Sequence, residues 1–167
     1  MIEKFVLLVS MLMPMAFPIS FTEEQKEVSK KIIKQANLMG EDPYSLMAIA
    51  YHESRLIRGR VSETGDAGIF QINWNFWGKR MWKYKSFAQF AKDMDDPTLG
   101  TIGAVVVLKE MRLYKTCIGI NLFACYNGGP AWMKSKNIDK IAKYARMVEI
   151  RRKRYEKKYP SWKKGNE

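Results

Sequence analysis

Histidine and cysteine are scarce in this 167-residue chain, which has one histidine and two cysteines. These residues form no cluster with the spacing of metal ligands, and no Ser or Cys motif suggests a hydrolytic triad. The apolar run from Phe5 to Met13 is too short to span a bilayer comfortably. No internal repeat, low-complexity tract or linker divides residues 21–167, so one domain is expected there.

Acidic residues are also few: the chain has 17 Asp and Glu but 29 Lys and Arg, which gives a formal net charge of +12. Such a surface favours polyanions: nucleic acid, acidic lipid head groups or an anionic cell wall. Charge alone does not choose among them. The composition, with 47% hydrophobic and 28% charged residues, is that of a globular protein.

Residues 1–20 are typical of a secretory signal peptide. Lys4 provides a positive start, Pro14 and Pro18 interrupt any helix after the apolar core, and Ala16 or Ser20 offers a small residue for cleavage. An uncleaved N-terminal anchor is the alternative. Either way the domain is expected to be exported, periplasmic or secreted.

The two cysteines, Cys117 and Cys125, lie eight positions apart. In an exported domain they can form a disulfide that closes a short loop, although two buried thiols in a packed helix pair fit the spacing equally well. The acidic run 93–96 partly matches a calcium-binding loop, but Pro97 breaks the pattern. No metal and no cofactor is therefore predicted.

Helix signals dominate the remaining chain. Residues with capping potential precede most apolar stretches: Thr22, Asp42, Ser86, Asp96 and Asn137. The expected helices cover about 23–39, 43–56, 86–94, 97–114 and 119–126, followed by a strongly basic last helix. Residues 68–73 are expected to form a short strand or a tight turn. The fold class predicted is mostly α (α+β).

One acidic residue stands out on the second expected helix. Leu46, Ile49, Ala50 and Glu53 share one helical face, so the carboxyl group continues an apolar stripe. A surface glutamate at a helix end is one interpretation. The other is a half-buried acid whose raised pKa keeps a proton available near neutral pH. A glycosidic oxygen needs such a donor, because the leaving alcohol departs poorly unless it is protonated.

Three motifs occur in a suggestive order: E-S-R-L from Glu53, S-x-x-G-D-x-G-I-F-Q-I-N from Ser62, and A-C-Y-N-G-G from Ala124. Together they resemble the lysozyme-like lytic transglycosylases with an SLT domain. The likeness is to the small exported types of secretion, conjugation, pilus or phage systems, and it covers roughly residues 42–155. It implies a lysozyme-like single domain at 21–167 with a basic C-terminal helix.

The resemblance also implies roles for individual residues. Glu53-Ser54 matches the catalytic Glu-Ser of the family, and the implied substrate-binding residues are Ser54, Gly68, Phe70, Gln71, Tyr126 and Asn127. The motif places a tyrosine near the acid, which favours that role for Tyr126 over simple packing. Gln71 and Asn127 suit N-acetyl and hydroxyl groups, or else they cap and bond loop backbone. Ser54 bonds near Glu53 or the substrate, unless it bonds its own helix backbone. The chain departs from the family pattern at Gly100, Ala104 and Gly128.

The implied reaction cleaves the bond between N-acetylmuramic acid and N-acetylglucosamine of peptidoglycan. Glu53 would protonate the glycosidic oxygen and then, as a base, help the muramyl C6 hydroxyl attack C1, which gives a 1,6-anhydro product. A muramidase, the alternative, more often needs a second carboxylate. Asp66 and Glu63 are nearest in sequence, and Asp66 also has the position of a turn former.

Other residues remain open to two interpretations. His52 neighbours Glu53, but adjacent helical positions do not face each other, so it is assigned to packing or surface. An aromatic cluster either lines the groove and stacks on sugars or belongs to the core: Trp74, Phe76, Trp77, Trp82 and Tyr84.

The basic tail, residues 151–164, would suit a non-catalytic nucleic-acid-binding module. Anionic wall polymers, or a component of a secretion, conjugation or pilus apparatus, explain its charge as well. For an exported protein nucleic acid is the less expected partner. The protein is predicted to act as a monomer on glycan strands.

Overall fold

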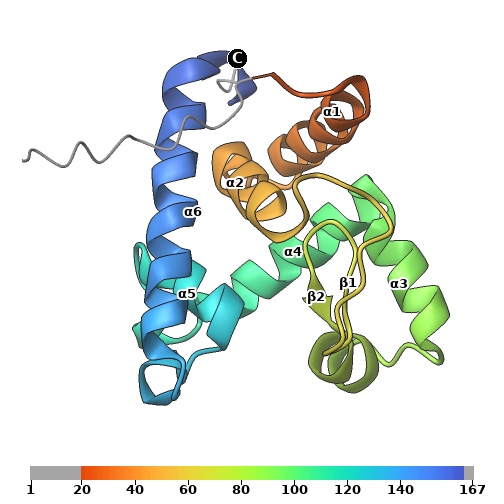
Figure 1. Cartoon of the computed structure of the whole chain (residues 1–167), viewed down its shortest axis with the longest axis vertical. Coiled ribbons are helices and arrows are strands. Elements are labelled where there is room, and N and C mark those ends of the chain that lie inside the picture. Colours follow the sequence, from red (N-terminus) through yellow and green to blue (C-terminus); the bar gives the residue numbers. More distant parts are fainter. Residues whose placement is uncertain (1–19, 164–167) are drawn as a thin grey trace, which may run out of the picture.

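The computed structural model describes residues 20–163, and helices dominate this part of the chain, as the sequence predicts (Figure 1). The main helices are α1 (Glu23–Leu38), α2 (Pro43–Ser54), α3 (Phe87–Asp95), α4 (Pro97–Met111), α5 (Asn121–Gly128) and α6 (Ile138–Lys158). Shorter elements are the π-helix η1 (Trp74–Met81), the 3-10 turns η2 (Lys115–Cys117), η3 (Trp132–Lys134) and η4 (Pro160–Trp162), and the strands β1 (Asp66–Ala67) and β2 (Ile72–Asn73). The predicted signal or anchor, apart from Ser20, lies outside the described residues.

Four helices begin at the caps expected from the sequence. Thr22 forms a complete capping box, and the side chains of Asp42, Ser86 and Asp96 each accept a hydrogen bond from a backbone N–H of the first turn. Asn137 was expected to cap the last helix in the same way, and this prediction is wrong. It precedes α6, but its φ of −101° and ψ of 18° differ from the extended backbone of the other caps, and its side chain makes no cap bond.

Helix α2 is the centre of the fold. Every residue from Pro43 to Tyr51 is buried, so the helix is covered on all sides instead of along a single stripe. Helices α1 and α6 contact it from either side, and α4 packs against both α1 and α2 (Figure 1). Burial weakens only in the last turn, where Glu53 is partly accessible. The last turn of the central helix therefore places the carboxyl group of Glu53 where the core meets the surface.

The small sheet follows α2 through a loop. Residues 68–71 form a turn between β1 and β2, which pair antiparallel with Asp66 opposite Asn73 and Ala67 opposite Ile72. The segment 68–73, which was expected to form a strand or a turn, thus contains a turn and strand β2. Strand β1 lies directly before this segment. The π-helix η1, which no sequence signal predicts, comes directly after β2.

Two cross-links hold the ends of helices in place. A disulfide joins Cys117 in η2 to Cys125 in α5. The guanidinium of Arg112, after α4, donates two hydrogen bonds of 2.6 Å to the buried carboxylate of Glu41, which precedes α2. Between residues 20 and 163 no helix has both the length and the apolar character needed to cross a membrane.

Candidate active site

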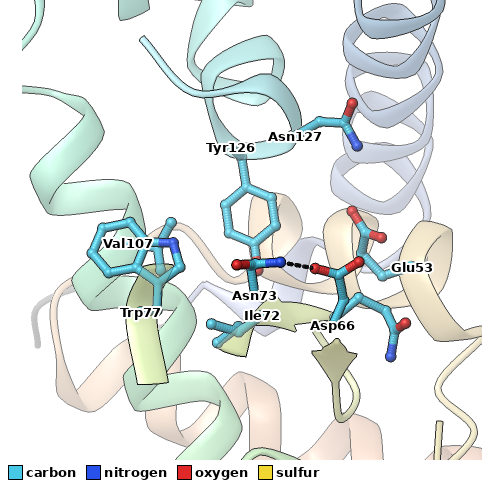
Figure 2. A pocket seen from close by; sticks show the side chains of 9 residues that line it. Glu53, Asp66, Ile72, Asn73, Trp77, Val107, Tyr126 and Asn127 are labelled. Atoms are coloured by element: carbon cyan, nitrogen blue, oxygen red, sulfur yellow. Dashed lines mark hydrogen bonds between the residues drawn. The ribbon is translucent and has the colours of Figure 1, made fainter. Parts of the chain in front are cut away.

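A groove of about 190 Å³ opens where the end of α2 meets the small sheet and α5 (Figure 2). Six helices and strands, and the turn between the two strands, supply the side chains that line it: Glu53, Asp66, Gln71, Ile72, Asn73, Trp77, Val107, Tyr126 and Asn127. The groove therefore brings together residues from all three sequence motifs. Four of the predicted site residues lie in it, namely Glu53, Gln71, Tyr126 and Asn127.

Glu53 has the environment of a proton donor. Burial raises the pKa of its carboxyl group, and the nearby charge of Asp66 adds to this, whereas a hydrogen bond from Tyr144 lowers it. The net effect is a pKa of about 7 instead of 4.5. Both the protonated and the ionised form of Glu53 are therefore populated at neutral pH. In Figure 2 the carboxyl group points into the groove from the last turn of α2.

Tyr144 is a site residue that the sequence motifs do not identify. Its hydroxyl donates a 2.6 Å hydrogen bond to Oε1 of Glu53 and fixes the orientation of the carboxyl group. The residue lies on the inward face of α6 with Ile141, Ala145 and Val148, all buried. The apolar spacing along α6 indicates that this face is buried. It does not indicate a partner that lies 91 positions earlier.

Asp66 is the second carboxyl group in the groove, and its own neighbours hold it firmly. Oδ1 accepts a hydrogen bond from Asn73, and Oδ2 accepts one each from Ser62 and Thr64. The backbone N–H of Asp66 also donates to Ser62. These bonds are those of a turn-forming aspartate, yet the side chain stays close enough to Glu53 to raise the pKa of that group.

The turn between the strands depends on two residues with positive φ. At Gly68 (φ +77°) a Cβ atom would lie 2.0 Å from the carbonyl oxygen of Met94, so only glycine fits. Gln71 adopts φ 47°. Its Nε2 donates to the carbonyl oxygens of Gly68 (2.8 Å) and Arg60 (3.1 Å). Since both amide hydrogens are used, the carbonyl oxygen is the part of Gln71 left to bind a ligand.

Tyr126 bonds this turn and also lies close enough to Glu53 for the charge of that group to raise the pKa of the tyrosine. Its hydroxyl donates a 2.9 Å hydrogen bond to the carbonyl oxygen of Phe70. Tyr126 thus lies near the acid, as the resemblance implies, but the hydroxyl that bonds Glu53 is that of Tyr144. The next residue, Asn127, is exposed at the edge of the groove, where its amide is accessible.

Ser54, Gly68 and Phe70 are not among the residues that line the groove. Ser54 is 1% exposed, and its hydroxyl donates to the carbonyl oxygen of Ala50 in its own helix. Phe70 is completely buried. Neither side chain lines the groove, and the contact of these three residues with substrate stays a prediction.

The aromatic cluster divides into two groups. Trp77 lines the groove, and the partly exposed ring of Phe76 meets it edge-on with 4.9 Å between ring centroids. The other members surround the buried ring of Phe90 in the core: Trp74, Trp82 and Tyr84. Trp77 is thus the member of the cluster that can touch a ligand in the groove.

His52 packs behind the site. Its ring meets that of Tyr144 edge-on at 4.8 Å, and burial together with the charges of Arg151 and Arg55 lowers its pKa to about 4. The imidazole is therefore neutral at physiological pH. As the sequence predicts, His52 is a packing residue, and it does not line the groove.

Comparison with protein families gives one match: the model described as the transglycosylase SLT domain aligns with residues 30–147. The aligned region contains all the groove residues and extends just beyond Tyr144. Neither the curated proteins nor the solved structures contain a match to the chain.

Proposed function

Because this chain belongs to the transglycosylase SLT domain family, we propose that it is a peptidoglycan lytic transglycosylase. Membership makes the fold lysozyme-like and supports cleavage of peptidoglycan strands in general. The finer proposal is that the enzyme cleaves the β-1,4 bond between N-acetylmuramic acid and N-acetylglucosamine. The product would be a 1,6-anhydromuramyl end.

In this proposal a single carboxyl group performs both proton transfers. Glu53 gives its proton to the glycosidic oxygen as the bond to C1 breaks, and it is left as a carboxylate. The muramyl C6 hydroxyl then attacks C1 and loses its proton to Glu53. No water is consumed, and the acid is restored for the next cycle.

The observation that carries the proposal is the state of Glu53. Its pKa of about 7 means that both the protonated and the ionised form are accessible at neutral pH, as a group that acts first as acid and then as base requires. The hydroxyl of Tyr144 restrains the carboxyl group between the two steps. The carbonyl oxygen of Gln71, the amide of Asn127 and the ring of Trp77 provide contacts for N-acetyl groups and sugar faces.

A muramidase acting on the same bond is the second candidate, and Asp66 is the observation that favours it. A hydrolase more often uses a second carboxylate to form a covalent intermediate or to activate water. Asp66 lies in the same groove as Glu53. However, both of its oxygens already accept hydrogen bonds within the loop, which suits a structural and electrostatic role better than attack on the sugar.

Mass spectrometry of the fragments released from purified peptidoglycan tests both candidates. Anhydromuramyl ends support the transglycosylase, and reducing ends support the muramidase. Glu53→Gln should abolish release, whereas Glu63→Gln, which alters an exposed acid of the same loop, should leave it unchanged. A Glu53→Gln protein that clears peptidoglycan as fast as the wild type would disprove the assignment of the acid.

We also propose that the enzyme acts outside the cytoplasm, with residues 1–20 as a signal or anchor. Peptidoglycan lies there, and the Cys117–Cys125 disulfide suits an oxidising compartment. A monomer that works beside a secretion, conjugation or pilus apparatus fits this location. Fractionation of bacteria that express the full chain should find it in the periplasm or the medium. Retention in the cytoplasm as a reduced protein would contradict this.

A further inference from the structure

Exposed apolar side chains occur in the two segments that flank α5, and none of them lines the groove. Two segments carry them, 113–120 between α4 and α5 and 131–138 between α5 and α6. Leu113 is 74% exposed and Ile118 is 70% exposed, so most of the surface of each residue is open to solvent. The exposed apolar residues of this region, called the apolar tip below, are Leu113, Tyr114, Ile118, Ile120, Met133 and Ile138.

Bonds and packing contacts connect both segments to the same helices. The hydroxyl of Thr116 donates a 2.9 Å hydrogen bond to the carbonyl oxygen of Pro130, which connects the first loop to the second. The Cys117–Cys125 disulfide ties the first loop to α5, and η3 in the second loop contacts both α5 and α6. In Figure 1 these loops lie around α5 and the start of α6. The exposed residues are thus presented by a braced scaffold.

The charge around the apolar tip is positive. Residues 113–140 contain four lysines and a single acid, Asp139. All four lysines, Lys115, Lys134, Lys136 and Lys140, are exposed, and none forms an ion pair with another residue between 20 and 163. Their charges therefore remain available to an anionic partner.

From this combination we propose that the apolar tip docks on an anionic lipid surface. A bilayer with acidic head groups accepts apolar side chains at the acyl boundary and attracts lysines at the head groups. An anionic wall polymer would engage the lysines but leave Leu113 and Ile118 in water. A second copy of the chain would bring four lysines against four lysines, which disfavours self-association through this surface.

Docking of the apolar tip on a membrane would also fix the position of the active site relative to that membrane. Helix α5 spans only eight residues, with Cys125 bonded to the tip and Tyr126 and Asn127 in the groove. A membrane bound at the tip would thus lie one short helix away from the groove. The enzyme would then cut the glycan strands closest to the lipid surface.

The test measures amide hydrogen exchange by mass spectrometry on the full chain, with and without vesicles. Vesicles of phosphatidylcholine and phosphatidylglycerol in a 7:3 ratio should protect peptides from 113–120 and 131–138, and pure phosphatidylcholine vesicles should protect them far less. This readout separates the tip from residues 1–20. If the protein sediments with vesicles while both segments exchange at unchanged rates, the proposal is wrong.

Variants sharpen the test. The double change Leu113→Ser and Ile118→Ser should weaken binding to anionic vesicles by roughly tenfold or more, because two large side chains lose their apolar surroundings. Leu38→Ser, at an equally exposed site on α1, is the matched control and should bind as the wild type does. Both proteins should retain wall cleavage. Equal binding of the double variant and the wild type to anionic vesicles would overturn the proposal. Protection of the tip without lipid at high protein concentration would also overturn it, and would indicate that the tip binds a second copy of the chain.

Discussion

Replacing Glu53 with glutamine should stabilise the folded protein at neutral and alkaline pH while it abolishes catalysis. In the unfolded chain the carboxyl group titrates near 4.5, and in the folded protein its pKa is about 7. Between these values the folded state binds a proton that the unfolded state releases. The free energy of unfolding of the wild type therefore falls as the pH rises from about 4.5 to about 7 and then levels off.

The size of the effect follows from the shift in pKa. One pKa unit corresponds to about 1.4 kcal/mol, so the shift at Glu53 costs the wild type at most about 3 kcal/mol above pH 7, less whatever groove water screens. Glutamine carries no charge, and its carbonyl oxygen can still accept the hydrogen bond from Tyr144. For a domain of this size the gain corresponds to about 6–12 °C in Tm.

Urea denaturation of both proteins at pH 4, 6 and 8 measures the difference. The Glu53→Gln protein should match the wild type at pH 4 and exceed it progressively at pH 6 and pH 8. Glu63→Gln serves as the control, because that side chain is exposed, and its curve should follow the wild type throughout. Parallel curves for Glu53→Gln and the wild type at all three pH values would refute the raised pKa and, with it, the reasoning for a proton donor.

Three further predictions concern the surroundings of the acid. Tyr144→Phe removes the hydrogen bond that lowers the pKa of Glu53, so the alkaline limb of the pH–rate profile should move up by about one pH unit; an unmoved limb would contradict this. Gly68→Ala should destabilise the protein by at least about 3 kcal/mol in urea denaturation, because its Cβ would meet the backbone of Met94; a loss below about 1 kcal/mol would exclude that clash. Trp77→Leu should raise KM for soluble glycan fragments several-fold with a smaller change in kcat, and an unchanged KM would remove Trp77 from the substrate site.

Local signals in the sequence predict the helices well. The caps at Thr22, Asp42, Ser86 and Asp96 depend on side-chain chemistry within four residues, so their helix starts follow from the sequence. Helix ends are less certain. The helix expected to reach Leu56 ends at Ser54, because the next two residues adopt left-handed backbone conformations that the sequence does not indicate.

The sequence predicts some of the site residues but not the contacts between distant helices. Glu53, Gln71, Tyr126 and Asn127 belong to short motifs, and all four line the groove. Which hydroxyl reaches the acid depends on how distant helices pack. Tyr126 and Tyr144 are both tyrosines on apolar faces, and only the three-dimensional arrangement assigns one to the turn and the other to Glu53.

The bond between Tyr144 and Glu53 makes the chemistry of the acid depend on the packing of a distant helix. Helix α6 packs along α2 and follows it in the chain after all of the other long helices that the structure describes. A chain in which α6 has not yet packed against α2 has neither the tyrosine that orients the acid nor the full burial that raises its pKa. Glu53 would then be an ordinary ionised glutamate at neutral pH. The proton donor therefore exists only after α6 has packed against α2.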